Sequence, residues 1–262
     1  MSEHFQALLE KAAAGGKQRL AMPVEYMKLS PLRQTSGMTR DAVPEAIIGA
    51  IAPQAIVGLP GRLVKLHLPN ADIRYVSGFY SVGLAGHFLA KLHQHKALNR
   101  WDRLGKGRYV IQWSDPPGSR YLFSEVEYVG EAFPEFVKKI RDDVIALLAP
   151  TYGEIGFNYC VCNLYVDGCS GVNWHSDAEP HLVAGSPIAC VSFGSQRVFS
   201  LAKIPTSLSQ TPEPSLNVRL ESGSLLVMAG ATQQHFLHAI SKEASVREPR
   251  FSLTFRVNHI DT

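Results

Sequence analysis

The sequence predicts an α+β fold in which the larger part is a sandwich or barrel of antiparallel strands. Helical patterns occupy the middle of the chain. After Pro150, short apolar or alternating segments follow one another with turn residues between them. Helices that come first and strands that come afterwards are typical of a domain in which helices cover an antiparallel sheet. We therefore expect any functional site to lie in the strand-rich part.

The composition is that of a folded chain. Of 262 residues, 45% are hydrophobic and 19% are charged, which excludes a disordered protein. The formal net charge of +3 neither requires nor excludes a nucleic-acid partner. No apolar run reaches the roughly 18 residues of a membrane span, and the stretch MSEHFQALLEKAAAGGKQRL lacks a signal-peptide pattern. We expect an intracellular protein of the nucleus or cytoplasm, or of a bacterial cytoplasm, without a membrane partner.

Four cysteines lie within about thirty residues of one another, and none forms a C-x-x-C pair. A zinc ribbon needs two such pairs, and disulfide scaffolds are typical of smaller, cysteine-rich chains. We therefore expect reduced, structural thiols at Cys160, Cys162, Cys169 and Cys190.

Residues 1–62 are predicted to be an N-terminal extension, partly flexible, that precedes one domain over residues 63–262. Residues 5–13 can form a helix, but two glycines follow, and prolines then recur as far as Pro60. Such a segment carries little hydrophobic core of its own.

The domain is predicted to begin with a strand and a helix. Residues 73–76 are strand-like, and residues 82–95 have Leu84, Phe88 and Leu92 at four-residue steps. This spacing places the three apolar side chains on one helix face, which predicts an amphipathic helix packed on a sheet.

Glycines and prolines then indicate a loop region around residues 109–113, before a second amphipathic helix over about 134–148. Beyond this helix the chain is predicted to be rich in strands. The expected strands are FNYCVCNLYV, PIACVSFG, VFSLAKI, NVRLESGSLLVM and RFSLTFRV.

The sharpest local motif is Asn-Trp-His-Ser-Asp, in which His175 and Asp177 stand two residues apart. Such residues of a strand share a face and can aim an imidazole and a carboxylate at one point. The alternative for an isolated His-x-Asp pair is a surface turn. A third ligand could come from His235, His238 or His259, and His238 stands out because strand-like segments flank it. Two histidines and one carboxylate on one face form the facial triad of non-haem Fe(II) oxygenases.

Such oxygenases usually need a co-substrate with a carboxylate, and a buried carboxylate needs an arginine. The sequence offers two arginines on one predicted strand. Arg250 and Arg256 are six residues apart, an even separation, so they face the same side as Ser252 and Thr254. Two cations on one face of a core-like strand are costly unless an anion meets them. The alternatives are an edge strand with snorkelling arginines and a phosphate-binding surface.

These residues lie in two runs, NLYVDGCSGVNWHSDAEPHLVAGSPIACVSFGSQRVFSL and SGSLLVMAGATQQHFLHAISKEASVREPRFSLTFR. In motif order over residues 157–256, the sequence closely resembles the AlkB family of Fe(II)/2-oxoglutarate oxidative demethylases. The pieces WHSDAEP, SVREPR and GATQ are most similar to the vertebrate AlkB homologue that prefers single-stranded DNA and RNA. The resemblance implies a double-stranded β-helix (jelly-roll) core with flanking N-terminal helices and a nucleotide-recognition lid.

The resemblance also implies roles for individual residues. Fe(II) would be held by His175, Asp177 and His238, with 2-oxoglutarate and O₂ as co-substrates. Asn163 and Tyr165 would hydrogen-bond 2-oxoglutarate, while Arg250 would pair with its distal carboxylate and Arg256 would lie near its other end. Ser252 replaces the asparagine that many family members carry, although its hydroxyl can still donate one hydrogen bond.

The resemblance further implies that a lid and an acidic residue contact the substrate base. Trp113 would stack on the flipped base, and Tyr121 and Phe123 match the family's Tyr-x-Tyr type motif, because a base taken out of its stack must be stacked again. Arg108 matches the lid arginine, and Glu179 the acid that contacts the damaged base. Two departures, Gly107 in place of proline and Ala178 in place of a second acid, concern lesion preference.

The implied activity is oxidative removal of N-methyl groups from bases such as 1-methyladenine and 3-methylcytosine, with release of formaldehyde, in alkylation repair or RNA demethylation. The expected partner is methylated single-stranded DNA or RNA, with duplex DNA as a further candidate, and the protein is expected to be a monomer. Two alternatives are an AlkB-like oxygenase acting on protein or lipid, and a catalytically silent nucleic-acid-binding module. A base is a poor substrate if Arg108, Trp113 and Tyr121 do not line the iron pocket.

Overall fold

The computed structural model describes residues 61–104, 106–123, 126–205, 212 and 214–259, without the side chains of 121–123 and 126. The predicted extension over 1–62, with its helix at 5–13, lies almost wholly outside the described residues, so the domain boundary stays a prediction. In the described part of the chain, no helix is both long enough and apolar enough to cross a membrane.

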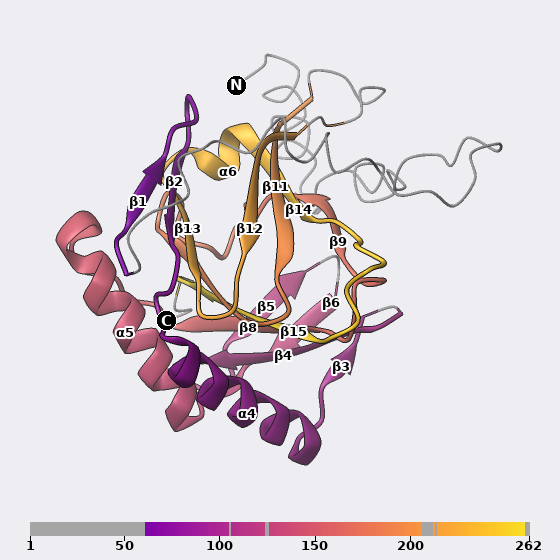
Figure 1. The fold of residues 1–262 in the computed structure, drawn as a ribbon. Coiled ribbons are helices and arrows are strands. Elements are labelled where there is room, and N and C mark those ends of the chain that lie inside the picture. Colours follow the sequence, from indigo (N-terminus) through magenta and orange to yellow (C-terminus); the bar gives the residue numbers. More distant parts are fainter. Residues whose placement is uncertain (1–60, 105, 124–125, 206–211, 213, 260–262) are drawn as a thin grey trace.

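The strands of the described chain form two β-sheets and a hairpin (Figure 1). The larger sheet has the order β1 (Val64–Leu66), β2 (Asp72–Val76), β13 (Leu225–Ala229), β10 (Ile188–Gly194), β15 (Arg250–Arg256), β8 (Tyr159–Tyr165), β4 (Arg108–Ser114) and β3 (Asp102–Arg103), and β7 (Glu131–Ala132) also pairs with β4. The smaller sheet has the order β12 (Pro214–Leu220), β11 (Arg197–Lys203), β14 (Phe236–Ile240) and β9 (Val172–His175). The hairpin consists of β5 (Arg120–Phe123) and β6 (Val126–Val129).

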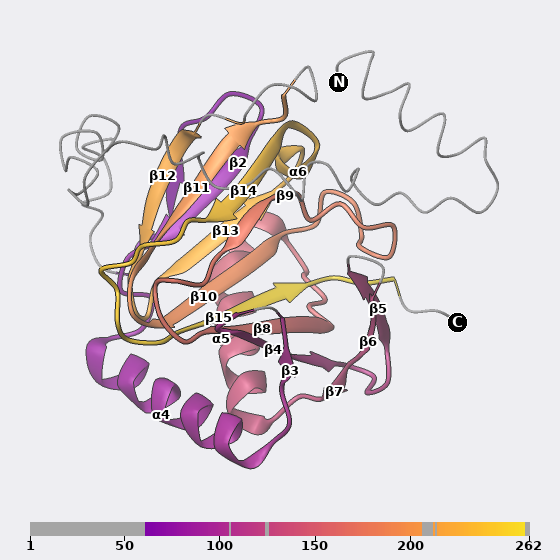
Figure 2. The same ribbon diagram turned by 90° about the vertical axis from the view of Figure 1, so that its right-hand side faces the viewer.

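Two helices cover one face of the larger sheet, and the smaller sheet stands on its other side (Figure 2). The helices are α4 (Val82–Leu98) and α5 (Glu135–Tyr152). Except for the parallel contact between β4 and β7, the paired strands of the described chain are antiparallel. This arrangement confirms the predicted α+β class and the jelly-roll core with flanking helices.

The predicted helices form, with differences at their edges. Ser81 caps α4, where its side-chain oxygen accepts a hydrogen bond from the Leu84 backbone N–H at 3.4 Å. Phe88 and Leu92 are buried against the sheet, and burial of each such side chain contributes about 1.5–3 kcal/mol. Leu84, which the spacing places on the same face, is 42% exposed, and Ala85 takes the buried position in the first turn instead.

The loop predicted around residues 109–113 is wrong, because this segment is the interior of strand β4. The flanking glycines and prolines end the strand rather than interrupt it, while the segment between them is rich in β-branched and aromatic residues. Alternation along β4 directs Arg108, Val110 and Gln112 toward the inside of the jelly roll. It directs Ile111 and Trp113 into the core beneath the helices.

Candidate metal and co-substrate site

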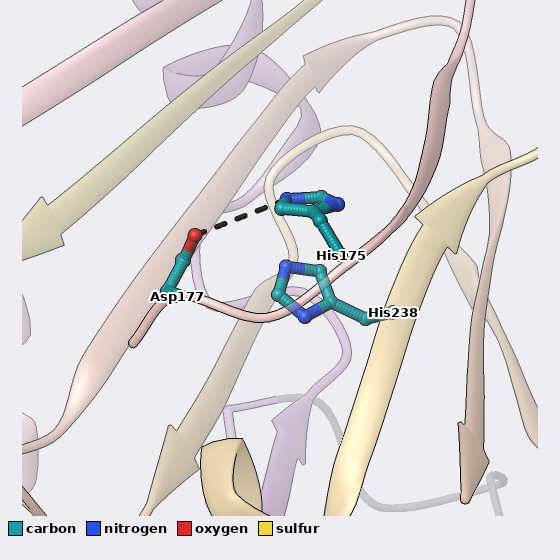
Figure 3. A group of neighbouring side chains, drawn as sticks. All are labelled: His175, Asp177 and His238. Atoms are coloured by element: carbon teal, nitrogen blue, oxygen red, sulfur yellow. Dashed lines mark ion pairs between the residues drawn. The ribbon is translucent and has the colours of Figure 1, made fainter. Parts of the chain in front are cut away.

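Three potential metal ligands meet between the two sheets. His175 is the last residue of β9, and the register of the smaller sheet places it directly opposite His238 of β14. The side chains of these histidines and of Asp177 offer ligand atoms that all lie within 4.8 Å of one another. Figure 3 shows the two rings beside each other and facing the carboxylate, with 4.1 Å between the ring centroids.

Asp177 follows the end of β9 rather than lying on the strand, so the strand-alternation argument for this residue is wrong. Its position is fixed by contacts instead. The Asp177 backbone N–H donates to Gln233 Oε1 at 2.9 Å, and Arg256 Nη2 donates to Asp177 Oδ2 at 2.7 Å. Its other carboxylate oxygen, Oδ1, is buried without a hydrogen-bond partner and lies 3.8 Å from His175 Nε2. A buried oxygen of this kind is costly unless a cation meets it.

The protonation states of the three groups suit a metal ion. Burial lowers the pKa of His175 and lowers that of His238 to about 3, so both rings are neutral near pH 7. Burial opposes ionisation of Asp177, but Arg256 and the two neighbouring histidines together outweigh it and hold the pKa of this carboxyl well below its usual range. His175 Nδ1 lies 2.8 Å from the Asn173 carbonyl oxygen and must donate to it, which leaves the lone pair on Nε2 for a metal.

The other two histidines considered as ligands are not part of this group. His235 lies in the short helix α6 (Thr232–His235), and the backbone N–H of His259 bonds to the His181 carbonyl. Within the described ranges, the one cluster of at least three His, Cys, Asp or Glu side chains with metal-ligand spacing is His175, Asp177 and His238.

One cavity contains the triad and the residues assigned to 2-oxoglutarate. The register of the larger sheet explains this, since Arg250 stands opposite Tyr165 and Ser252 opposite Asn163. The predicted co-substrate residues that line the cavity are Asn163, Tyr165, Arg250, Ser252 and Arg256. The prediction that both arginines share a face with Ser252 is confirmed, and both are buried.

Arg250 has the properties of an anion anchor. It is 1% exposed, and its Nη2 donates to Ser192 Oγ at 3.0 Å, whereas its Nε and Nη1 are buried and have no hydrogen-bond partner. No carboxylate in the described part of the chain pairs with it. The Tyr165 ring centroid lies 5.4 Å from its Cζ. A buried guanidinium with two unpaired N–H groups fits a carboxylate ligand.

A third buried arginine, Arg197, was not singled out from the sequence. Arg197 donates from Nη2 to the Ser170 carbonyl at 2.8 Å and from Nη1 to the Asp167 carbonyl at 3.2 Å, and its Nε donates to Glu243 Oε1 at 3.3 Å. These contacts fix the loop before β9 and the loop after β14. Arg197 thus supports the two strands that supply His175 and His238.

Other cavity residues were also missed by sequence reasoning. The Phe199 ring stacks on the His238 ring, with 5.4 Å between centroids and an interplanar angle of 24°, and so positions that ligand. Gln112, Tyr128 and Cys190 also line the cavity. The even spacing of Arg108 and Gln112 would place both side chains on one face of a strand, but the loop predicted for this segment hides that signal. The four cysteines are free, as expected.

The predicted substrate residues are only partly brought together. Arg108 lines the cavity, and Glu179 is not among its lining residues, so its role stays a prediction. Tyr121 and Phe123 lie in β5, but their side chains are outside the described part of the structure. The role predicted for Trp113 is wrong. This side chain is fully buried beneath the helices, 5.4 Å from the His95 ring and 6.4 Å from the Trp101 ring between centroids.

Replacement of Trp113 should therefore affect stability and not substrate binding. We expect Trp113→Phe to lower the free energy of unfolding by about 1–3 kcal/mol, because it leaves a void in a fully buried site. Chemical denaturation measures this loss. The KM for a methylated oligonucleotide should stay unchanged in the folded variant, whereas Arg108→Ala should raise it. A raised KM in Trp113→Phe would contradict the placement of this side chain.

Comparison with known families supports the interpretation of this cavity as a metal and co-substrate site. The sequence matches the family model described as the 2OG-Fe(II) oxygenase superfamily over residues 88–256. The chain belongs to the 2OG-Fe(II) oxygenase superfamily. The matched span contains the triad and Arg250, and this superfamily implies Fe(II), 2-oxoglutarate and O₂.

Within the 2OG-Fe(II) oxygenase superfamily, the relatives are AlkB homologues, which confirms the predicted family. Over 108 residues the chain is 42% identical to the alpha-ketoglutarate-dependent dioxygenase alkB homolog 3 of Homo sapiens, which corresponds to 40% of this chain and 38% of that protein. The same shares apply to the Bos taurus protein of that name, also 42% identical. The DNA oxidative demethylase ALKBH2 of Arabidopsis thaliana is 30% identical over 217 residues, 72% of this chain and 67% of that protein. The chain thus spans well under half the length of the homolog 3 proteins that it matches.

A solved structure titled "The structure of OsALKBH1" shares the fold of this 2OG-Fe(II) oxygenase superfamily member. It aligns with a TM-score of 0.56 at 17% sequence identity, over 76% of this chain and 100% of that chain. At this identity the similarity supports the jelly-roll fold alone.

Proposed function

We propose that this protein is an Fe(II)- and 2-oxoglutarate-dependent dioxygenase that removes N-methyl groups from nucleic-acid bases, such as 1-methyladenine and 3-methylcytosine, and releases formaldehyde. The observation that carries the proposal is a single cavity that contains three metal-ligand atoms within 4.8 Å and a buried arginine with two unpaired N–H groups. The names of the AlkB homologues that the chain resembles support the same reaction.

The proposed roles follow from the contacts of each residue. His175, Asp177 and His238 hold Fe(II), while Arg256 holds the far oxygen of the aspartate and Phe199 packs on the ring of His238. When bound, Fe(II) and 2-oxoglutarate supply the oxidation of an N-methyl carbon by O₂, and the hydroxylated methyl group then leaves as formaldehyde.

The remaining polar residues of the cavity orient the co-substrate. The Arg250 guanidinium receives the distal carboxylate of 2-oxoglutarate, since two of its nitrogens have no partner in the protein, and Ser192 holds the third. Tyr165 and Asn163 stand beside it on β8. No side chain is required as a nucleophile, because the protein contributes coordination, orientation and exclusion of water.

A nucleic acid is the proposed macromolecular partner, with single-stranded DNA or RNA preferred, duplex DNA as a further substrate, and a monomeric enzyme acting in the nucleus or cytoplasm. Basic residues between the second half of α4 and β5 would follow the phosphate backbone, each contact adding a salt-dependence slope of about −0.7 on a single strand. They are Lys91, Lys96, Arg100, Arg103, Lys106, Arg108 and Arg120.

The decisive assay is formaldehyde release from oligonucleotides that carry one 1-methyladenine or 3-methylcytosine. We expect turnover that requires Fe(II) and 2-oxoglutarate, with the highest kcat/KM on single strands among matched single-stranded DNA, duplex DNA and RNA. The Glu179→Ala variant should lose demethylation more than substrate-free succinate formation if this carboxylate contacts the base. Absence of turnover on all methylated nucleic acids would refute the proposed function.

The lid criterion does not decide between a base and another substrate, because Arg108 lines the cavity, Trp113 does not, and the Tyr121 side chain is outside the described structure. The same assay distinguishes the two alternatives. Formaldehyde release from methylated peptides or oxidation of lipids, without turnover of nucleic acids, would indicate an oxygenase of another substrate class. Binding of oligonucleotides without metal binding or succinate formation would indicate a silent module. The neutral imidazoles and the buried, unpaired oxygen of Asp177 argue against a catalytically silent module, because each offers a lone pair that can bind a metal ion.

A further inference from the structure

The cavity has a polar side chain on β4 to which the proposed reaction assigns no role. Gln112 lines the cavity and is only 5% exposed. It lies on the same face of β4 as Arg108, and the register places it opposite Val161 of β8. The adjoining strand β15 has Thr254 opposite Val161, so Gln112 belongs to the row of inward-facing residues between Ser252 and Arg256.

The orientation of the Gln112 amide is set by a neighbour. The Tyr159 hydroxyl donates a hydrogen bond to Gln112 Oε1. Tyr159 is fully buried, and burial raises its pKa, so the hydroxyl stays protonated at neutral pH. With Oε1 occupied, the part of the amide left for a ligand is its NH₂ group. In the described ranges, Gln112 has no other hydrogen bond, and this NH₂ group is not used by the protein.

The charged groups of the lining are mostly donors as well. The guanidinium groups of Arg108, Arg250 and Arg256 line the cavity. Among the described lining residues the one carboxylate is that of Asp177, which is engaged by Arg256 and belongs to the metal triad. The charged groups available to a ligand in this space are therefore N–H donors, which require an acceptor on the ligand.

An aromatic wall accompanies the amide. Tyr128 comes from strand β6 of the hairpin, lines the cavity, and packs in one apolar cluster with Val110, Tyr159 and Val161. An aromatic side chain in this place suits a planar base, because each base has a face that can stack on a ring. The cluster thus brings a stacking surface and a fixed NH₂ donor to the same part of the cavity.

We propose that Gln112 makes the site select methylated bases that carry a carbonyl beside the methylated nitrogen. The inference rests on the proposed function and identifies the preferred substrate within it. In 3-methylcytosine the carbonyl at position 2 adjoins the methylated nitrogen and accepts a hydrogen bond from an amide NH₂. In 1-methyladenine the methylated nitrogen lies between a C–H and an amino group, neither of which accepts one.

Charge does not distinguish these two bases, since both are cations at neutral pH. The difference is that 1-methyladenine would leave the Gln112 NH₂ group buried without a partner, which carries a desolvation cost. A site built around a polar contact rejects the analogue that lacks it more strongly than an apolar pocket can. We therefore expect 3-methylcytosine to be preferred, by roughly tenfold in kcat/KM for a single base-edge contact.

The test compares formaldehyde release from two single-stranded oligonucleotides that differ only in the lesion, 3-methylcytosine or 1-methyladenine. Gln112→Ala should lower kcat/KM roughly tenfold on 3-methylcytosine and raise it on 1-methyladenine, which then leaves no buried NH₂ group without a partner. Gln112→Glu is isosteric but replaces the donor by an acceptor, so the preference should reverse. Tyr159→Phe removes the group that orients the amide and should reduce the preference. Gln94→Glu, the same substitution on an exposed residue of α4, should leave the ratio unchanged.

The outcomes separate this inference from the proposed function. Lack of formaldehyde from both lesions in the wild type would overturn the proposed function itself. Turnover of both lesions with the same ratio in wild type, Gln112→Ala and Gln112→Glu would overturn only the role of Gln112. An equal fall on both lesions would likewise overturn it, because a damaged fold lowers both rates together. Thermal unfolding of each variant identifies that case, and the isosteric Gln112→Glu provides a second variant if Gln112→Ala does not fold.

Discussion

Replacement of His238 by alanine should abolish Fe(II) binding and lower turnover by more than about 100-fold. Loss of contacts that merely orient a metal ligand typically costs 10- to 100-fold in affinity or activity, and loss of a ligand itself should cost more. His238 and His175 face each other across β14 and β9, and burial lowers the pKa of both rings, so the wild-type site presents two lone pairs at neutral pH. The variant retains one imidazole and the Asp177 carboxylate.

The measurement is anaerobic titration with Fe(II), or with Co(II) as a spectroscopic substitute, followed by succinate and formaldehyde assays. The matched control is His235→Ala, which removes a histidine three residues away on α6 and outside the triad. This control should keep metal affinity and turnover. Undiminished metal binding by His238→Ala, or an equal loss in His235→Ala, would show that the triad is not the metal site.

Alternation along a single strand correctly placed the two arginines of β15, although it failed for Asp177, which lies beyond the end of β9. The placement of Arg250 and Arg256 on one face with Ser252 followed from even spacing, and the structure has all of them on the cavity wall. The same rule applied to β4 would have prevented the error at Trp113. Arg108 and Trp113 are an odd number of residues apart, so a strand cannot direct both into one pocket. The lid role of Trp113 rests on the family resemblance, and the alternative of core aromatics in a strand pair is the arrangement that the structure has.

Positions that depend on pairing between distant segments could not be predicted. Gln112 reaches the cavity because β4 pairs with β8, some fifty residues later in the chain. Phe199 reaches His238 because β11 pairs with β14. Such registers depend on tertiary packing, which has no local sequence signal. Strand β14 is not among the expected strands, and the strand assumed around His175 ends at that residue instead of continuing to Asp177.

Replacement of Arg250 should raise the KM for 2-oxoglutarate by about 10²- to 10³-fold, because removal of one partner of a buried charge pair costs about 3–5 kcal/mol. Arg250→Lys keeps the charge but not the forked geometry that matches a carboxylate, so we expect an intermediate KM. Steady-state kinetics with varied 2-oxoglutarate measure both. Arg219→Ala serves as the control, since this arginine lies on β12 of the smaller sheet with its side chain 43% exposed.

A stability measurement distinguishes an anchoring role of Arg250 from a structural one. Without 2-oxoglutarate, Arg250 is a buried cation with two unpaired N–H groups, a costly arrangement for the folded state. Arg250→Met should therefore be neutral or stabilising in the unliganded protein, as replacements of buried charges by apolar residues often are. Saturating 2-oxoglutarate with Mn(II) should stabilise the wild type by about 2.7 kcal/mol at 100 times Kd, and should not stabilise the variant. If Arg250→Met instead lowers the free energy of unfolding of the unliganded protein, and 2-oxoglutarate still stabilises the variant, the guanidinium supports the sheet and the co-substrate carboxylate binds elsewhere.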